Sequence, residues 1–373
     1  MKLAQFTTLS VGGIGMSVTH LERAHEFYSA AQIDSRFRSG HILGGGSNVV
    51  ISDNPLAEAL VIIRSQSRVN LPPVDAEGTV TFDAAEPWSD VADALVLAGL
   101  KSVENLVGIP GTVGGAVVQN IGAYGSELSS VVHSVTVYDR EDNETLCLTA
   151  EECDFSYRNS LFKGSTSPRF VVMSLRLHVQ FGASHVPNYD ELAEVLELRD
   201  GPRPHGYSIS SVRSAVLSLR ASKNMIFDAS DGESRGVGSF FVNPLVSVDE
   251  IPRIAAATPC AVEDVPHYPV DAASNNGNSQ RWPVLTKVPA AWLIENAGFL
   301  KGYRSGRIGL ACGHALSIVN ATGAGLAEEI LELASQIRAA VQTKFGVSLD
   351  LEPILLGFSP KELDKYSLGS LAT

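Results

Sequence analysis

Two glycine-rich segments are the part of the sequence whose residue types and spacing most directly suggest chemistry. The first follows Ile42-Leu43 and reads Gly44-Gly45-Gly46-Ser47-Asn48, and the second extends from residue 107 to residue 125. Because glycine adopts positive φ angles and lets backbone N–H groups approach an anion, such segments are suited to binding phosphates. Either segment alone is more simply explained as a tight turn. Together, about 60 residues apart and each beside apolar strands, they predict a single large phosphate-bearing ligand.

Familiar nucleotide-binding and catalytic motifs are incomplete in this sequence. The segment Gly201–Gly206 has the glycine spacing of a Walker A loop but lacks the Lys that must follow it. Gly13–Gly15 and Gly44–Gly46 both lack the third glycine of a Rossmann loop. Ser160-x-x-Lys163 matches the S-x-x-K pattern of penicillin-binding enzymes, but no K-T-G follows it. The nine histidines show no H-x-x-x-H spacing, so no metal site is predicted.

The elements that would position these segments mix strands and helices irregularly. Apolar runs and period-two alternation predict strands over residues 42–43, 49–51, 60–63, 79–82, 131–138 and 170–179. A period of 3.6 residues predicts helices over residues 89–99, 190–198, 211–221 and 325–345. A polar stretch at 228–236 favours a domain boundary, and 266–282 is expected to form a loop. Because strands and helices do not alternate strictly, we expect an α+β fold with several domains.

Length and composition limit the class of protein. The 373 residues carry a formal charge of −13, with 45% hydrophobic and 18% charged residues, which is typical of an ordinary globular protein of two or three domains. No apolar run is long enough for a membrane span, and the N-terminus has no secretory pattern. The four cysteines form no C-x-x-C pair. We therefore expect a cytoplasmic protein, without membrane insertion and without a nucleic-acid partner, because negative charge disfavours phosphate-backbone contacts.

Further motifs follow the first glycine segment in a fixed order. They are Glu104-Asn105-Leu106, Gly108-Ile109-Pro110-Gly111-Thr112-Val113-Gly114-Gly115-Ala116, Asn120-Ile121-Gly122-Ala123-Tyr124-Gly125, Tyr157-Arg158-x-Ser160, Gly238-Ser239-Phe240-Phe241, Ala291-Trp292-Leu293, His314-Ala315 and Glu352-Pro353. This ordered set resembles the UDP-N-acetylenolpyruvoylglucosamine reductase family, the flavoenzymes of bacterial cell-wall precursor synthesis. The resemblance spans about residues 7–357, nearly the whole chain.

The resemblance implies an FAD-binding fold of the vanillyl-alcohol-oxidase type in two α+β subdomains, followed by an α+β substrate-binding domain. The expected boundaries are 1–67, to which the segment 346–373 returns, then 68–226 including the Tyr189 loop, then 227–345 for the substrate domain. FAD is expected to be held noncovalently, with NADPH as the hydride donor. The residues that match cofactor-binding positions are Gly44, Gly45, Gly46, Ser47, Asn48, Pro110, Gly111, Thr112, Gly114, Gly115, Asn120, Ile121, Gly122, Ala123 and Arg220.

The resemblance also implies the reaction, which is reduction of UDP-N-acetylglucosamine enolpyruvate to UDP-N-acetylmuramate. Hydride addition to the β-carbon of the enol ether leaves negative charge on the α-carbon and its carboxylate, so fixed positive charge and donors are needed there. Arg158 is suited to that carboxylate because its guanidinium is always charged and planar. Ser239 matches the family's proton donor to the α-carbon, and Glu352 matches an acidic partner that stabilises the intermediate if protonated in the closed site.

Substrate-binding positions and assembly follow from the same resemblance. Tyr189 matches the tyrosine of a mobile loop in the family's loop-bearing type I subtype, and its Pro- and Gly-rich surroundings suit a lid. Lys223 and Asn243 match positions that contact the diphosphate and uridine, and Tyr124 matches a residue near the sugar. Lys287 adds positive potential or is simply solvated. We expect a monomer.

Two other functions remain open at the level of sequence. One is another FAD-dependent oxidase of the same fold, although many of these tether FAD through His or Cys, and neither occurs at 44–48 or 108–125. The other is a nucleotide-binding protein without turnover, in which Ser239, Arg158 and Glu352 would be incidental. Bound oxidised flavin absorbs near roughly 450 nm, so a visible spectrum separates the flavoenzymes from the last alternative.

Overall fold

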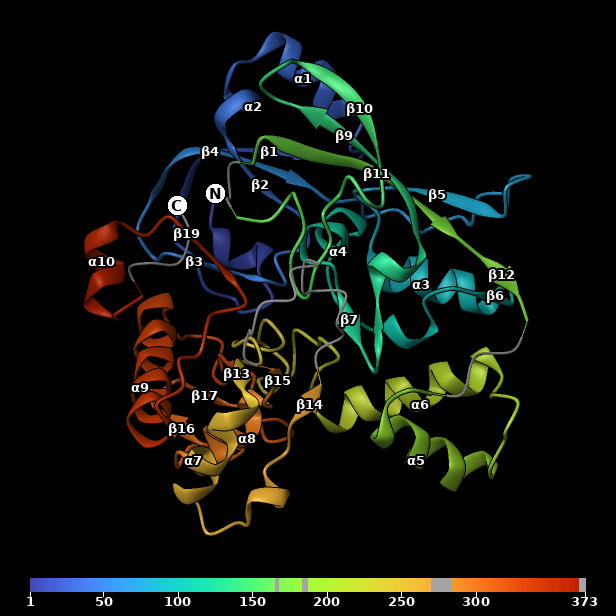
Figure 1. The fold of residues 1–373 in the computed structure, drawn as a ribbon. Helices are drawn as coiled ribbons and strands as arrows, with labels where there is room; N and C mark the ends of the chain where they lie inside the picture. Colours follow the sequence, from blue (N-terminus) through green and yellow to red (C-terminus); the bar gives the residue numbers. More distant parts are fainter. Residues whose placement is uncertain (165–167, 183–186, 270–283, 369–373) are drawn as a thin grey trace.

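The computed structural model describes residues 1–164, 168–182, 187–269 and 284–368. Its first part contains a parallel sheet in the order β1-β4-β2. A second parallel pair joins β3 to β19, so the end of the chain returns to its beginning (Figure 1). Leu60, Ile62 and Ile51 form the centre of its core. The elements are β1 Gly15–Leu21, α1 Glu26–Ile33, α2 Arg36–Ser39, β2 His41–Leu43, β3 Val49–Ile51, β4 Leu56–Ile63 and β19 Ile354–Leu356.

The second part is built on an antiparallel sheet in the order β10-β9-β11-β5, and its helices α5 and α6 pack together, with α6 contacting α3 (Figure 1). Val135 and Val137 of β9 are fully buried, and so is Trp88, whose indole donates to the Leu106 carbonyl at 3.0 Å. These contacts fix the second glycine segment. The elements are β5 Thr79–Asp83, α3 Trp88–Leu97, β6 Leu100–Lys101, α4 Val113–Gln119, β7 Gly122–Ala123, β8 Ser126–Glu127, β9 Val132–Asp139, β10 Glu144–Thr149, β11 Phe170–His178, β12 Gln180–Phe181, α5 Asp190–Asp200 and α6 Ile209–Ser222.

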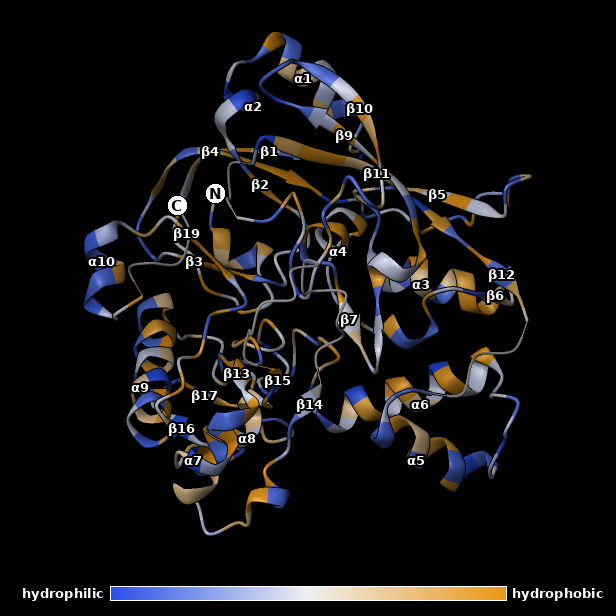
Figure 2. Ribbon diagram, viewed as in Figure 1, coloured by the Kyte–Doolittle hydropathy of each residue, from blue (hydrophilic) through white to orange (hydrophobic). Residues whose placement is uncertain are grey.

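The third part holds two small antiparallel sheets, in the orders β13-β15-β14 and β16-β17-β18, and both β17 and α8 pack against the long helix α9. Helix α9 buries Ile330, Leu333, Ile337 and Val341 on one face, as its apolar period requires, and Figure 2 shows hydrophobic and hydrophilic residues alternating along it. The elements are β13 Leu245–Ser247, α7 Ile251–Ala256, β14 Tyr268–Pro269, β15 Leu285–Lys287, α8 Ala290–Asn296, β16 Arg304–Ser305, β17 Ile308–Leu310, β18 Ile318–Val319, α9 Ala327–Phe345 and α10 Pro360–Lys365.

The α+β prediction is confirmed, and the four predicted helices correspond to α3, α5, α6 and α9 with ends shifted by at most two residues. The predicted strands 42–43 and 49–51 are also present, but they enter different pairings, β2 with β4 and β3 with β19. The expected loop 266–282 contains the short strand β14, and its residues 270–282 lie outside the described part of the chain. Within the described ranges, no helix combines the length and apolarity needed to cross a membrane.

Candidate active site

A cavity of about 1400 Å³ lies between the three parts of the molecule. Both glycine segments, Arg158, Ser239 and Glu352 contribute to its walls, although they are far apart in the sequence. Every residue predicted from the sequence to belong to the site lines this cavity, except Asn120. The fold therefore brings together nearly the whole predicted set.

The two glycine segments touch each other through backbone that leaves no room for side chains. A Cβ atom on Gly45 would lie 2.5 Å from the Cα of Gly111, and one on Gly44 would lie 2.4 Å from the Thr112 hydroxyl oxygen. The Ser47 hydroxyl donates to the Pro110 carbonyl at 3.1 Å and ties the segments together. The result is a continuous backbone surface along one wall of the cavity, suited to an extended phosphate-bearing ligand.

Arg220 supplies a buried positive charge beside this surface. Its Nη2 donates to the Met225 carbonyl at 2.8 Å, but its Nε has no hydrogen-bond partner among the described residues. Burial lowers the pKa of the guanidinium without removing its charge at neutral pH. Because Gly108 lies against the same guanidinium, the unpaired donor sits beside the second glycine segment. An unpaired buried donor is costly unless a ligand accepts from it, so these residues fit the diphosphate of FAD.

Asn120 lies behind this wall, at the end of α4. It is fully buried with a left-handed backbone, and its side-chain amide donates to Glu127 at 3.0 Å and to the Ser156 carbonyl at 2.9 Å. The amide oxygen accepts from the Ser129 N–H at 3.0 Å. The Asn120 side chain thus ties the second glycine segment to its neighbours and does not face the cavity.

Arg158 and Glu352 form an ion pair in the cavity wall, with 3.1 Å between Arg158 Nε and Glu352 Oε1. Both side chains are mostly buried, at 19% and 13% exposure. Solvent and salt therefore screen this ion pair less than they screen a pair on the surface. Gln119 donates its side-chain amide to the same Oε1 at 2.9 Å. The guanidinium also donates to the Gly122 carbonyl at 2.7 Å. These contacts fix the direction in which Arg158 presents its positive charge.

The backbone around Arg158 is shaped to allow this arrangement. Arg158 itself has a φ of 56°, a conformation that non-glycine residues rarely adopt, and Lys163 donates to its carbonyl oxygen at 2.7 Å. Burial lowers the pKa of the Lys163 ammonium. A Cβ on Gly122 would lie 2.8 Å from the Arg158 Nη1 and 2.9 Å from the Ser126 carbonyl oxygen, so glycine at this position leaves room for the guanidinium.

Ser239 lies in an irregular segment, between Gly238 and Phe240, that is hydrogen-bonded on both sides. The neighbouring Phe240 donates its N–H to the Leu316 carbonyl at 2.8 Å and accepts at its own carbonyl from the Glu352 N–H at 3.0 Å. The backbone that carries Ser239 is thus bonded directly to the backbone that carries Glu352. Asn48 of the first glycine segment donates to the Glu352 carbonyl at 3.3 Å, which links this region to the glycine wall.

The residues expected to bind substrate line two regions of the cavity. Tyr124 and Tyr189 pack edge to face with ring centroids 5.5 Å apart, and burial raises the pKa of Tyr124 to about 12. The Lys223 ammonium lies 5.7 Å from the Tyr124 ring centroid and forms an ion pair with Glu191. Asn243 instead accepts from the Ala290 N–H at 2.8 Å, at the start of α8, in the other region.

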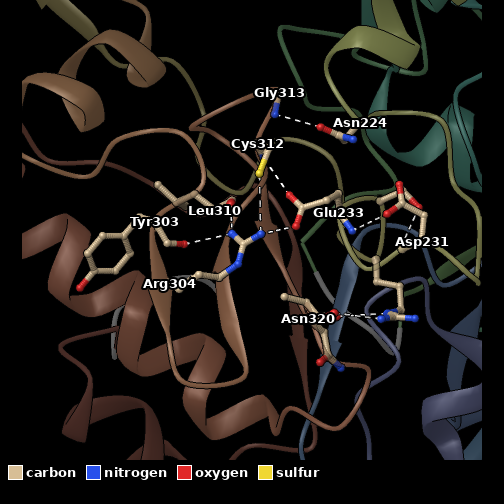
Figure 3. A network of polar contacts seen from close by, with 12 residues as sticks. Asn224, Asp231, Glu233, Tyr303, Arg304, Leu310, Cys312, Gly313 and Asn320 are labelled. Atoms are coloured by element: carbon tan, nitrogen blue, oxygen red, sulfur yellow. Dashed lines mark hydrogen bonds and ion pairs between the residues drawn. The ribbon is translucent and has the colours of Figure 1, made fainter.

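A polar network holds the turn at residues 311–314 against the end of α6. Figure 3 shows the Glu233 carboxylate between Arg304 and the Cys312 backbone N–H, which donates to it at 2.8 Å. Gly313 donates to the Asn224 side chain at 2.9 Å, and its Cα has no space for a side chain against Lys223. The network therefore fixes His314 at the cavity wall.

His314 is neutral in this position. Burial, assisted by nearby Lys223 and Lys301, lowers the pKa of its imidazole from 6.5 to about 4. Its Nδ1 accepts from the Leu316 N–H at 3.0 Å, so the proton of the neutral ring is on Nε2. His314 thus contributes a hydrogen-bond donor and no charge to the cavity.

Several cavity residues were not predicted as site residues from the sequence. Gln119, Tyr157 and His314 lie within motifs recognised there, but only their place in the fold shows what they contact. Lys287, considered as a source of positive potential, lines the cavity with its ammonium 4.0 Å from the Tyr157 ring centroid. Lys287 and Tyr157 are far apart in the sequence, so no local pattern predicts their contact.

Comparison with known families and proteins agrees with this site. Residues 231–356 match the model of the UDP-N-acetylenolpyruvoylglucosamine reductase C-terminal domain, and residues 34–148 match that of an FAD binding domain. A UDP-N-acetylenolpyruvoylglucosamine reductase of Thermobifida fusca is 38% identical, over 95% of this chain and 96% of its own. The corresponding protein of Mycobacterium marinum is 36% identical, over 95% and 94%.

A solved structure shows the same fold. The crystal structure of UDP-N-acetylenolpyruvylglucosamine reductase (MurB) from Thermus caldophilus superposes with a TM-score of 0.61. It covers 95% of this chain and 97% of its own, at 22% identity. The α+β arrangement of an FAD-binding part and a C-terminal part is therefore shared over nearly the full length.

Proposed function

The chain belongs to the UDP-N-acetylenolpyruvoylglucosamine reductase family, and from this premise we propose how its own residues carry out the family's reaction. The chain is an FAD-dependent oxidoreductase of peptidoglycan precursor synthesis, which reduces UDP-N-acetylglucosamine enolpyruvate to UDP-N-acetylmuramate with NADPH. The observation that carries the assignment of roles is the shared cavity, which joins the glycine wall to Ser239, Arg158 and Glu352.

The glycine wall and Arg220 are the residues that would hold FAD. The backbone of Gly44–Asn48 and Pro110–Gly115 offers close approach, and the Arg220 Nε offers a free donor to a phosphate oxygen. When bound, FAD would supply the hydride-transfer chemistry that links NADPH to the enolpyruvyl β-carbon. Asn120 contributes by fixing the second glycine segment.

Arg158 stabilises the charge that hydride addition produces. Negative charge develops on the substrate α-carbon and spreads into its carboxylate, and a fixed guanidinium in a mostly buried cavity stabilises such charge strongly. Glu352 orients that guanidinium through its 3.1 Å contact with Arg158 Nε, and Gln119 in turn holds the Glu352 carboxylate by a 2.9 Å hydrogen bond. Glu352 therefore acts on the reaction by holding Arg158 in position.

Ser239 donates the proton that completes the reduction. An enolised carboxylate is basic enough to take a proton from a serine hydroxyl that lies beside its α-carbon. The backbone of Ser239 is held rigidly, since Phe240 bonds to both Leu316 and Glu352. The hydroxyl recovers its proton from solvent after the product leaves.

The remaining assignments concern the substrate nucleotide, the subtype and the assembly. Tyr124, Tyr189, Lys223 and Asn243 bind the sugar and nucleotide, and the Tyr189 segment supports the loop-bearing type I subtype. We assign the protein to the cytoplasm, where NADPH and the nucleotide sugar are present. All three parts of one chain line the cavity, so a second copy is not needed to complete it; light scattering should give a monomer of 39.6 kDa.

An anaerobic two-step assay tests this function. NADPH should bleach the flavin absorption of the purified holoenzyme, and UDP-N-acetylglucosamine enolpyruvate should restore it, whereas simple alcohols should not. Recolouring by alcohols or sugars would favour an oxidase of the same fold. A colourless protein that cannot be reconstituted with FAD would favour a nucleotide-binding protein without turnover.

A further inference from the structure

Lys223 forms an ion pair with a carboxylate of helix α5. Its ammonium contacts Glu191, the second residue of α5, and the two side chains are 19% and 40% exposed. The same ammonium faces the Tyr124 ring, and Gly313 packs directly against the Lys223 backbone. Lys223 is therefore enclosed on several sides, with Glu191 as its charged neighbour.

The helix that carries Glu191, α5, is acidic although it borders a cavity proposed to bind a diphosphate. Within Asp190–Asp200 there are five acidic residues and one basic residue, and Asp190, Glu191 and Glu194 all line the cavity. A diphosphate that reaches Lys223 comes close to the Glu191 carboxylate, and two negative groups that share one ammonium repel each other. Binding of such a ligand therefore weakens the existing ion pair or displaces Glu191 from it.

We propose that Glu191 is an affinity-determining residue, which competes with the substrate diphosphate for Lys223. This inference rests on the proposed function, in which Lys223 contacts the diphosphate. Glu191 lowers the affinity for any nucleotide diphosphate, and it leaves affinity for an uncharged nucleoside unchanged. A ligand gains full access to Lys223 only when the rest of its contacts are good enough to offset the lost ion pair.

The test is calorimetric titration of the flavin-loaded enzyme with UDP and with uridine. Glu191→Gln keeps the size of the side chain and removes its charge, and it should tighten the Kd for UDP about two- to fivefold, as expected for a partly exposed ion pair. The Kd for uridine should not change. Glu194→Gln removes the same charge from the same helix at a cavity-lining position that has no ion pair among the described residues, and it should change the UDP Kd by less than about twofold.

The same substitutions in an enzyme that lacks Lys223 separate competition for Lys223 from a simple change in the charge of the cavity. In the Lys223→Met enzyme, Glu191→Gln should change the Kd for UDP no more than Glu194→Gln does. Any of three results would overturn the inference. Glu191→Gln could leave the Kd for UDP unchanged or raise it, Glu194→Gln could lower that Kd equally, or Glu191→Gln could also lower the Kd for uridine. A native enzyme that binds no UDP at all would instead contradict the proposed function, and flavin absorbance of each variant confirms that it is folded.

Discussion

At the scale of single residues, the chemistry depends on how the Arg158 guanidinium is held. Its Nε pairs with Glu352, one Nη donates to Gly122, and its backbone is fixed by Lys163. A point charge on a flexible chain cannot reproduce several donors with fixed directions. The geometry therefore requires arginine and not merely a positive charge.

Arg158→Lys should lower kcat for substrate reduction by about 100-fold or more, in the range found when one charge-stabilising donor is removed. Stopped-flow measurement of flavin reoxidation by substrate gives this rate. The matched control is Arg213→Lys, because Arg213 also makes a two-point ion pair, with Asp93, but does not line the cavity. Equal rates for Arg158→Lys and the native enzyme would show that charge alone is sufficient.

His314 gives a prediction about pH and stability. Its pKa falls from 6.5 to about 4 in the folded protein, mainly through burial. Between these values the unfolded chain binds a proton at this residue that the folded chain does not, so the contribution of His314 lowers the free energy of unfolding as pH falls from about 6.5 to 4. His314→Gln should make urea unfolding less sensitive to pH in this window. Parallel pH profiles for the native protein and the variant would contradict the prediction.

At the scale of elements, the two glycine segments act as one surface because their backbones touch. Gly45→Ala would place its Cβ 2.5 Å from the Gly111 Cα, and backbone cannot move aside as a side chain can. The variant should therefore lose FAD on purification, measured as the ratio of flavin to protein absorbance, and the apoprotein should unfold at a lower temperature.

Gly115→Ala is the matched control for that variant. Its Cβ meets nothing closer than 3.6 Å, and alanine favours a helix, so the apoprotein should keep its unfolding temperature. A Gly45→Ala protein with native stability and full flavin content would show that the contact between the segments is dispensable.

The elements also show which parts of the fold can be predicted from sequence. Helix α9 follows from the spacing of Ile330, Leu333 and Ile337, because its apolar face is local in the chain. The pairing of β3 with β19 joins residues about 300 positions apart, and period-two patterns carry no information about a distant partner. Short strands such as β14, which has two residues, are too short to show the period-two alternation that predicts a strand.

In the site, too, features that are local in the sequence can be predicted, whereas contacts between distant residues cannot. The glycine segments, Arg158 and Ser239 are recognisable because family motifs are contiguous, and all of them line the cavity. Asn120 belongs to such a motif, but its side chain points away from the cavity into hydrogen bonds with Glu127 and Ser156. The Glu191–Lys223 pair joins two different helices, so only the fold reveals it.

At the scale of the whole molecule, three separate parts of the chain contribute to one cavity. The glycine wall comes from the first two parts, Ser239 from the third, and Glu352 from the segment that returns to the first. A backbone hydrogen bond from the Glu352 N–H to the Phe240 carbonyl, and one from the Asn48 side-chain amide to the Glu352 carbonyl, connect these parts. The domain boundaries expected from the sequence stay a prediction, whereas the shared cavity explains why the whole chain is needed for one reaction.

The central claim is that hydride acceptance and proton donation are separate tasks within this cavity, with Ser239 responsible for the proton. The most direct measurement is anaerobic stopped-flow absorbance of Ser239→Ala in its two half-reactions. Bleaching by NADPH should proceed at the native rate, while recolouring by UDP-N-acetylglucosamine enolpyruvate should slow by several orders of magnitude, because only the second step needs the hydroxyl proton. Equal slowing of both half-reactions, or an unchanged rate of recolouring, would contradict the account.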